Sequence, residues 1–276
     1  MIRIVRPGGS NACAISRRCR RVLQHSHSFS TSPETNKSSP AAAEKGNQKT
    51  DTTTNESTTL QSLILSRRTI SNFKVDEDTN LGRLRSSIER AVRCGQNAPN
   101  HKRTEPFSFR LLMSEESRNH LADICREVNV QKMRVNQKGS EASIQAEADR
   151  KRDRWSKIPA YLVALVKGAP LDRSSLDGQD KFYPPLPYQY PLSIRQMEDY
   201  GSVCAATQNV LLSLHADGFG TKWATGPVIE SLAFRELVKC GDDELVAALI
   251  MIGEPKRIPR PPRRRRTIEG DLLMEL

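Results

Sequence analysis

Apolar side chains recur with helical spacing over several stretches of the chain after residue 59. In one of them Leu84, Ile88 and Val92 fall on a single stripe, as they would on the buried face of a helix. Another ends at Asp217 and Gly218, a pair typical of a helix stop. The pattern predicts helices over residues 60–65, 81–94, 115–135, 197–216 and 230–238.

Other apolar stretches have the composition of strands. Residues 107–113 alternate aromatic, basic and aliphatic side chains, and residues 219–226 (FGTKWATG) fit a strand and turn. The runs YLVALVK (161–167) and ELVAALIMI (244–252) are dense enough to be buried on both faces of a sheet. A few strands interleaved with helices predict one α+β domain.

For two further segments the sequence pattern gives a less definite prediction of structure. Residues 136–157 are highly charged and are interpreted as a mobile, solvent-exposed helix or lid. Residues 181–191 (KFYPPLPYQYP) are predicted to form a loop that is too long and too aromatic to be an idle linker. The pattern assigns neither segment a role.

The first 57 residues differ in composition from the remainder. They are rich in Ser, Thr, Asn, Arg and Ala, and the first acidic residue is Glu34. This composition is typical of an organellar transit peptide and linker, with mitochondrial import favoured over a plastid; a plain disordered basic arm is the alternative. The folded domain is therefore predicted to span residues 58–276.

Charge and cysteine content narrow the functional classes. The 276 residues carry a net charge of +11, which would suggest nucleic acid or an anionic membrane as partner, but much of the excess lies at the two ends. The six cysteines form no CxxC pair, so neither a zinc site nor a redox dithiol is indicated. No apolar run approaches the roughly 20 residues that span a bilayer.

Four short motifs occur in a recognisable order. They are Arg67-Arg68-Thr69, NAPNHKRTEPF (97–107), KWATGP (222–227) and a basic tail after GEP (253–255). Over residues 60–266 the chain resembles the nitroreductase family of flavin-dependent oxidoreductases, particularly its short bacterial-type NAD(P)H nitroreductase branch. The resemblance implies a nitroreductase-like α+β fold, with a central, mostly antiparallel sheet flanked by helices, and a homodimer with FMN at its interface.

The resemblance also implies which residues contact the flavin. FMN has a phosphate and a ring edge that becomes anionic on reduction, so its site needs cations in two places. Arg67, Arg68 and Thr69 are expected to contact it from one chain, and Asn97 and His101 from the other. The two arginines could instead solvate the end of a helix, and His101 could be an ordinary surface histidine. Whether Lys102 contacts the flavin or solvent stays open.

The later motifs supply the remaining expected contacts, from Trp223, Ala224, Thr225, Gly226 and one of Arg263 and Arg264. Ala224 stands where several relatives carry arginine. Trp223 could equally be a core residue, and a basic run is often simply solvated.

The long helix over residues 197–216 is the expected dimer-forming element. Its small side chains would let another helix approach closely around a twofold axis. They are Gly201, Ser202, Ala205 and Ala206.

The resemblance implies an FMN-dependent NAD(P)H oxidoreductase. It would take a hydride from NADH or NADPH and reduce a small nitroaromatic or quinone-like acceptor in a ping-pong cycle, and no catalytic side chain is expected because the flavin carries the chemistry. One alternative is a flavin protein with a specialised dehalogenase-like or dehydrogenase-like reaction and another electron donor. The second is an organellar nucleic-acid-binding protein, although the strands lack the exposed aromatic and basic interleaving of a stacking platform.

Overall fold

A computed structural model describes residues 60–74, 80–168, 170–172, 174, 178–186 and 193–260 of the chain. The predicted transit peptide and linker, Arg263 and Arg264 lie outside these residues, as does the last part of the aromatic loop. No helix within the described ranges is long and apolar enough to cross a membrane.

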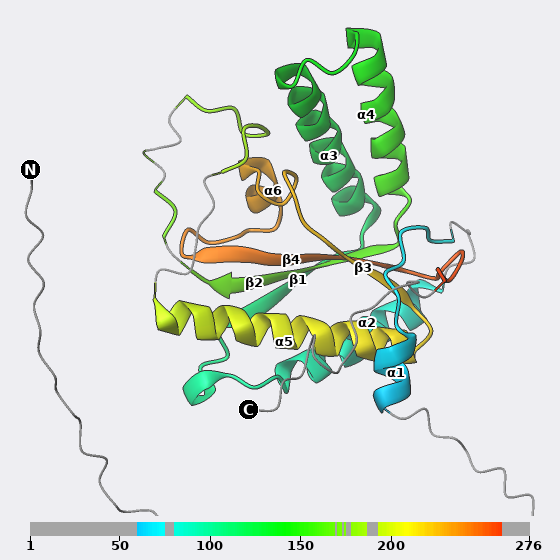
Figure 1. Cartoon of the computed structure of the whole chain (residues 1–276), viewed down its shortest axis with the longest axis vertical. Helices are drawn as coiled ribbons and strands as arrows, with labels where there is room; N and C mark the ends of the chain where they lie inside the picture. Colours follow the sequence, from blue (N-terminus) through cyan, green and yellow to red (C-terminus); the bar gives the residue numbers. More distant parts are fainter. Residues whose placement is uncertain are drawn as a thin grey trace, which may run out of the picture. The chain divides into compact units, whose positions relative to one another are not determined.

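Four strands form one sheet at the centre of the domain (Figure 1). They follow the order β1-β2-β4-β3, and each neighbouring pair is antiparallel, so the predicted antiparallel sheet is confirmed. A β-bulge interrupts the β2–β4 register between Ala164 and Leu165. The strands are β1 (Phe107–Leu112), β2 (Ala160–Lys167), β3 (Gly220–Ala224) and β4 (Glu244–Gly253).

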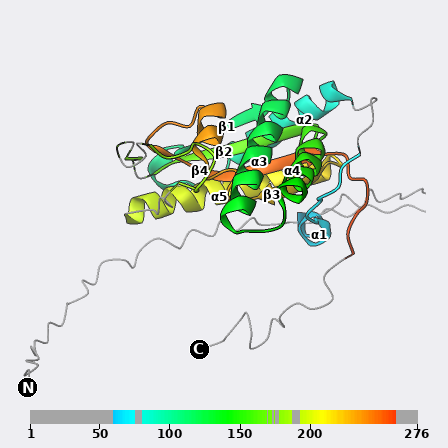
Figure 2. The ribbon, with the colours of Figure 1, turned by 90° about the horizontal axis from the view of Figure 1, so that it is seen from above.

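Helices cover both faces of the sheet (Figures 1 and 2). Along β2, Tyr161 and Val163 belong to the core on one side, whereas Leu162 and Ala164 belong to the core on the other. This alternation explains why the strand is apolar at nearly every position. One face is covered by α3 (Glu115–Val135) and α6 (Leu232–Leu237), and the other by α2 (Leu81–Gln96) and α5 (Ile194–Ala216).

The charged segment 136–157 forms a helix, α4 (Glu141–Ser156), that is largely exposed to solvent, as predicted. It pairs with α3 as a hairpin, in which Ile144 and Ala148 pack against Val130. Charged groups cross the same contact, with Arg126 Nε lying 2.6 Å from Asp149 Oδ1. Sparse apolar residues are enough to bury one face of the helix, although the surrounding charge hides them from the sequence pattern.

The described part of the aromatic loop lies against α6. The amide of Ala233 donates to the carbonyl of Lys181 at 3.0 Å, and the amide of Leu186 donates to the carbonyl of Glu230 at 2.9 Å. Phe182 packs against the core on this face of the sheet. The first half of the loop is therefore attached to the domain by backbone hydrogen bonds and by an aromatic anchor.

The chain enters the domain through α1 (Leu60–Ser66) and then crosses one end of the sheet. Thr69 forms an isolated bridge with Thr221 on β3, and Phe73 forms one with Pro255, just after β4. This crossing brings the Arg67-Arg68-Thr69 motif beside the start of β3 and close to the chain that follows β4.

The close contact at Gly220 gives a stability prediction. A Cβ atom at this position would lie 2.8–3.0 Å from side-chain atoms of Ile70. Gly220→Ala is expected to lower the unfolding free energy by about 1–3 kcal/mol, because a packed core resists added volume. Denaturant unfolding measures the change. A matched control is Gly82→Ala, whose Cβ would have its nearest neighbour at 3.4 Å; a similar loss in both variants would contradict the prediction.

Candidate functional site

Arg67 and Arg68 lie where α1 ends, against the last turn of α5. They line a hollow of about 100 Å³ together with His215 and Thr221. Arg68 Nη1 donates to the carbonyls of Leu65 at 2.6 Å and Arg67 at 2.8 Å, so Arg68 does cap the helix end, as the alternative interpretation expected. Neither arginine is paired with a carboxylate among the described residues.

His215 is a member of this hollow that the sequence analysis missed. Its Nε2 lies 2.9 Å from Ser66 Oγ. Burial lowers the pKa of His215 below its ordinary value, and the charges of Arg67 and Arg68 lower it further. The sequence signal for His215 was its position as a basic residue in the last turn of a predicted helix. The hollow therefore combines two guanidinium groups with an imidazole whose pKa lies below its ordinary value.

A bound phosphate should change the titration of His215. Its negative charge would oppose the effect of the two arginines, so the pKa of His215 is expected to rise when FMN or inorganic phosphate binds. An NMR titration of the imidazole with and without FMN measures the shift, and His120 on α3 serves as the reference because it lines a different hollow. An unchanged His215 pKa at saturating FMN would contradict a phosphate site here.

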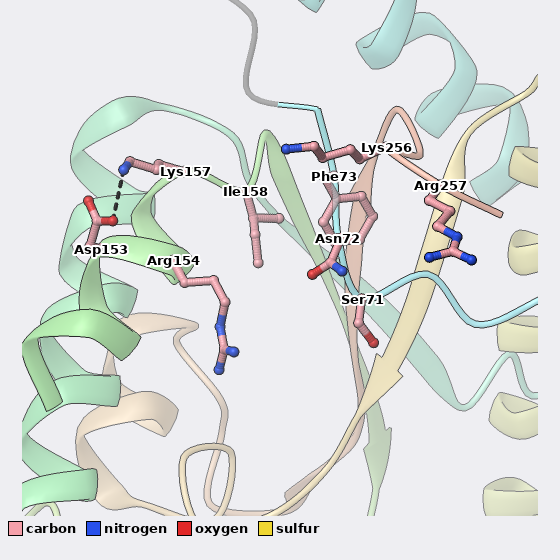
Figure 3. Close-up of a pocket in the computed structure, with 9 residues that line it drawn as sticks. All are labelled: Ser71, Asn72, Phe73, Asp153, Arg154, Lys157, Ile158, Lys256 and Arg257. Atoms are coloured by element: carbon pink, nitrogen blue, oxygen red, sulfur yellow. Dashed lines mark hydrogen bonds and ion pairs between the residues drawn. The ribbon is translucent and has the colours of Figure 1, made fainter. Parts of the chain in front are cut away.

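A second cleft, of about 650 Å³, is drawn in Figure 3. It lies between residues 71–73, the end of α4 and the chain after β4. Its buried members are Phe73 and Ile158. The two hollows share no lining residue: Ile70 and Pro255 line the smaller one, while the next residue after each lines the larger one.

Four cations line the larger cleft: Arg154, Lys157, Lys256 and Arg257. The acidic lining residue, Asp153, is already engaged, because its Oδ2 lies 2.8 Å from Lys157 Nζ (Figure 3). None of the other three cations has a carboxylate partner in the described part of the chain. A cleft with buried apolar side chains and unpaired cations suits a flat ring system that carries negative charge.

The sequence pattern does not single out Arg154 and Lys157. Both lie in the charged segment 136–157, which holds eight other charged residues. Their position became informative only because the chain passes directly from Ile158 into the buried strand β2. A basic pair just before a doubly buried strand was the available signal.

The KWATG motif lies close to the first hollow but does not line it. Thr221, which bridges to Thr69, comes two residues before Trp223. Trp223 is half-buried and packs against the core under α2 and α5, as its alternative interpretation expected, whereas Ala224 is buried on the opposite face. Thr225 is exposed, and Gly226 has a φ of 110°.

Asn97 and His101 lie elsewhere: Asn97 is at the end of α2, and His101 is near the first turn of α5. Asn97 ends α2, where its Nδ2 donates to the carbonyl of Arg93 at 2.9 Å. His101 Nδ1 lies 3.5 Å from Glu198 Oε2 on α5. His101 belongs to a 3-10 turn, η1 (His101–Arg103), that sits at the edge of the domain.

The turn that follows His101 has a strained backbone. Lys102, Arg103 and Glu105 have positive φ values of 54°, 55° and 44°, a backbone conformation that residues other than glycine rarely adopt. Arg195 on α5 supports the turn, donating to the His101 carbonyl at 3.2 Å and to Thr104 Oγ1 at 2.6 Å. Lys102 and Arg103 both have exposed side chains, and their role stays open.

In one chain the two groups of predicted flavin contacts lie at opposite ends of α5. His101 contacts Glu198, and the hollow beside Arg67 includes His215. From residue 198 to residue 215 a helix rises about 25 Å, at about 1.5 Å per residue. A single chain therefore does not bring His101 beside Arg67, and a shared site needs a second chain.

The antiparallel sheet, the helices on both faces and the cationic clefts define a nitroreductase-like α+β protein. Residues 64–254, more than half of the chain, match the model of the Nitroreductase family, and the chain belongs to that family. It is 22% identical over 205 residues to a Bacillus subtilis (strain 168) protein named "Putative NAD(P)H nitroreductase YfhC", covering 74% of this chain and 89% of the relative.

Solved structures share the fold. A nitroreductase-like family protein from Bacillus cereus matches with a TM-score of 0.58 and 21% identity, covering 79% of this chain and 95% of that one. An iodotyrosine deiodinase solved with FMN and 3-iodo-L-tyrosine matches with a TM-score of 0.51 and 18% identity, over 77% of this chain and 99% of the other. These likenesses confirm the predicted fold.

Proposed function

We propose that this protein is an FMN-dependent NAD(P)H oxidoreductase of the nitroreductase type. The observation that carries the proposal is the pair of hollows, whose linings combine buried apolar side chains with cations, most of which have no carboxylate partner among the described residues. FMN bound to the iodotyrosine deiodinase of the same fold supports the choice of flavin. When bound, FMN would accept a hydride from the nicotinamide donor and pass electrons to a second substrate.

The residues present fit the chemistry of FMN. Arg67 and Arg68 would hold its phosphate, since a guanidinium group matches a phosphate with two parallel hydrogen bonds. Arg154 would supply the second cation, for the ring edge that becomes anionic on reduction. Phe73 and Ile158 are buried and would exclude water from one side of the cleft.

We further propose that two chains complete each site. If two α5 helices pack antiparallel across a twofold axis, the first turns of one lie beside the last turns of the other. The His101 turn of one protomer would then reach the arginine hollow of its partner. Within one chain the His101 turn and the arginine hollow are about 25 Å apart, because α5 rises about 1.5 Å per residue. Between two chains packed in this way, the two groups would lie side by side.

Exposed apolar side chains support this arrangement. Leu65 on α1 is 68% exposed, and Ile194 and Met197 at the start of α5 are 79% and 63% exposed. α1 contacts the last turns of α5, so Leu65 lies toward one end of α5, while Ile194 and Met197 lie at the other end. A partner α5 in the antiparallel orientation would cover the apolar side chains at both ends at once. The association would remove these apolar surfaces from water.

The structure revises which small residues of α5 can face a partner. Ser202 and Ala206 are buried within their own chain, and a Cβ at Gly95 on α2 would lie 3.2 Å from the Ala206 carbonyl oxygen. They therefore serve the α2–α5 contact. Gly201 is exposed and Ala205 is half-buried, so these two remain available on the outer face.

The proposed acceptors are small nitroaromatic or quinone-like molecules, and the proposed compartment is the mitochondrion. The first rests on the family. The second rests on the Arg-rich, Ser-rich composition of the first 57 residues, which suits import.

Absorbance and anaerobic reduction test the function. Purified protein, or apoprotein given FMN, is expected to show a bound flavin spectrum that bleaches on mixing with NADH or NADPH in a stopped-flow instrument. Bound flavin that neither nicotinamide reduces would favour the alternative with another electron donor. A colourless protein that fails to bind added FMN would contradict the proposal.

A further inference from the structure

We propose that Arg195 is a positioning residue, which fixes the His101 turn in the shape that contacts the partner chain's flavin. The turn comprises residues 100–105, and Arg195 lies on the first turn of α5. The inference rests on the proposed function in its two-chain form. It adds to that function a residue that acts through His101.

The backbone of the His101 turn needs support from outside the turn. Three of its residues have positive φ values, a conformation that persists only where the surrounding structure holds it in place. The hydrogen bonds within the turn are long: Thr104 Oγ1 donates to the His101 carbonyl at 3.2 Å, and the Glu105 amide donates to Asn100 Oδ1 at 3.3 Å. Such contacts restrain the strained backbone only weakly.

Arg195 supplies the support from α5. Its Nη2 donates to Thr104 Oγ1 at 2.6 Å and to the His101 carbonyl at 3.2 Å, so one nitrogen ties the two ends of the 3-10 turn together. The guanidinium group is planar and its donors have a fixed geometry. The orientation of Arg195 therefore sets the orientation of the backbone that carries His101.

Two carboxylates on α5 complete the support. Asp199 is 7% exposed, and its Oδ1 lies 3.3 Å from Arg195 Nε. A buried carboxylate is costly without a counter-charge, so this pair keeps Arg195 in place. Glu198 Oε2 lies 3.5 Å from His101 Nδ1 and orients the imidazole. Positions 195, 198 and 199 share one face of the helix, which therefore presents all three side chains to the turn.

A double-mutant cycle on FMN affinity tests the inference. Arg195→Ala and His101→Ala are each expected to weaken FMN binding by about tenfold, the effect of losing one charge-assisted hydrogen bond. If Arg195 acts through His101, the double variant should also lose only about tenfold, because its second change removes a contact that the first has already disabled. Titration of apoprotein with FMN, followed by flavin fluorescence, measures all three values.

The visible absorption spectrum of bound FMN is a readout that a merely structural role would not move. At saturating FMN, Arg195→Ala and His101→Ala should change the spectrum in the same way, because both alter the polar groups around the flavin. Adding Glu105→Gly to Arg195→Ala should recover part of the lost affinity, since glycine adopts a positive φ without strain.

Arg126→Ala is the matched control. Arg126 also joins two elements, with Nε 2.6 Å from Asp149 Oδ1 and Nη2 donating to Gln145 Oε1 at 2.6 Å, and its side chain is 29% exposed, against 36% for Arg195. Its loss should leave FMN affinity and the flavin spectrum unaltered. If Arg195→Ala does not fold because Asp199 loses its counter-charge, the Arg195→Gln, Asp199→Asn variant removes both charges and replaces it in the cycle.

The outcomes separate the inference from the proposed function. Unaltered FMN affinity in the Arg195 variant overturns the inference alone. Losses that multiply to about a hundredfold in the double variant also overturn it, because the two residues would then act independently. Unaltered affinity in His101→Ala overturns the two-chain site together with the inference. An unaltered protein that fails to bind FMN overturns the proposed function as well.

Discussion

Replacement of Arg67 and Arg68 by alanine is expected to weaken FMN binding by about two orders of magnitude. Each hydrogen bond to a charged group contributes about 1.5–3 kcal/mol, and the double variant removes two guanidinium donors from the smaller hollow. Titration of apoprotein with FMN, followed by flavin fluorescence, measures the change. The fold should persist, because both side chains are only half-buried and neither is paired with a carboxylate among the described residues.

Riboflavin makes this prediction specific, because it lacks the phosphate of FMN. The Arg67→Ala, Arg68→Ala variant should bind riboflavin about as tightly as the unaltered protein does. A matched control removes two other arginines, Arg150 and Arg152, which are paired with Glu147 and Asp123 on the hairpin surface. An equal loss of riboflavin affinity in the Arg67 and Arg68 variant would show that these residues do not act on the phosphate.

Gly201→Trp is expected to dissociate the dimer and release its flavin. Gly201 is exposed on the outer face of α5, and a Cβ placed there meets no atom within 4 Å. A single chain can therefore accommodate the indole, whereas a dimer packed through α5 would have to open. Light scattering should report a monomer and ultrafiltration should recover free FMN, while circular dichroism stays unchanged.

Glu147→Trp on α4 is the control for this variant, since it places the same side chain on the hairpin surface, far along the chain from α5. It should leave both mass and flavin content unaltered. A monomeric Gly201→Trp protein that retains FMN would contradict a site built from two chains. A stable Gly201→Trp dimer would place the interface elsewhere.

Elements with a strong apolar pattern could be predicted from the sequence. The strands β2 and β4 are buried on both faces. Both ends of each strand lie within one residue of the predicted bounds. The packing of helix α4 could not be predicted from its apolar pattern. Its apolar positions, among them Ile144 and Ala148, are separated by charged residues, and their burial depends on α3, which no local pattern reveals.

The site was predictable only in part, for a similar reason. Short motifs identified Arg67, Arg68 and Thr69, which the structure does place at a hollow or beside β3. Arg154 and His215 could not be singled out, because their places in the two hollows are set by tertiary neighbours that are distant in sequence. The strained turn after His101 was also invisible, since positive φ values at Lys102 and Arg103 are set by the fold and not by residue type.

The central claim is that each flavin is held by Arg67 and Arg68 of one chain and by His101 of the other. Two flavin-deficient variants test it together: Arg67→Ala, Arg68→Ala in one chain, and His101→Glu, which places a carboxylate beside the flavin, in the other. The two chains are co-expressed with different affinity tags, and the hybrid dimer is purified through both tags.

A shared site predicts that the hybrid regains one FMN per dimer, because one of its two sites combines the intact arginines with an intact His101. The homodimer of each variant should bind little. A hybrid as free of flavin as its two parents would contradict the account.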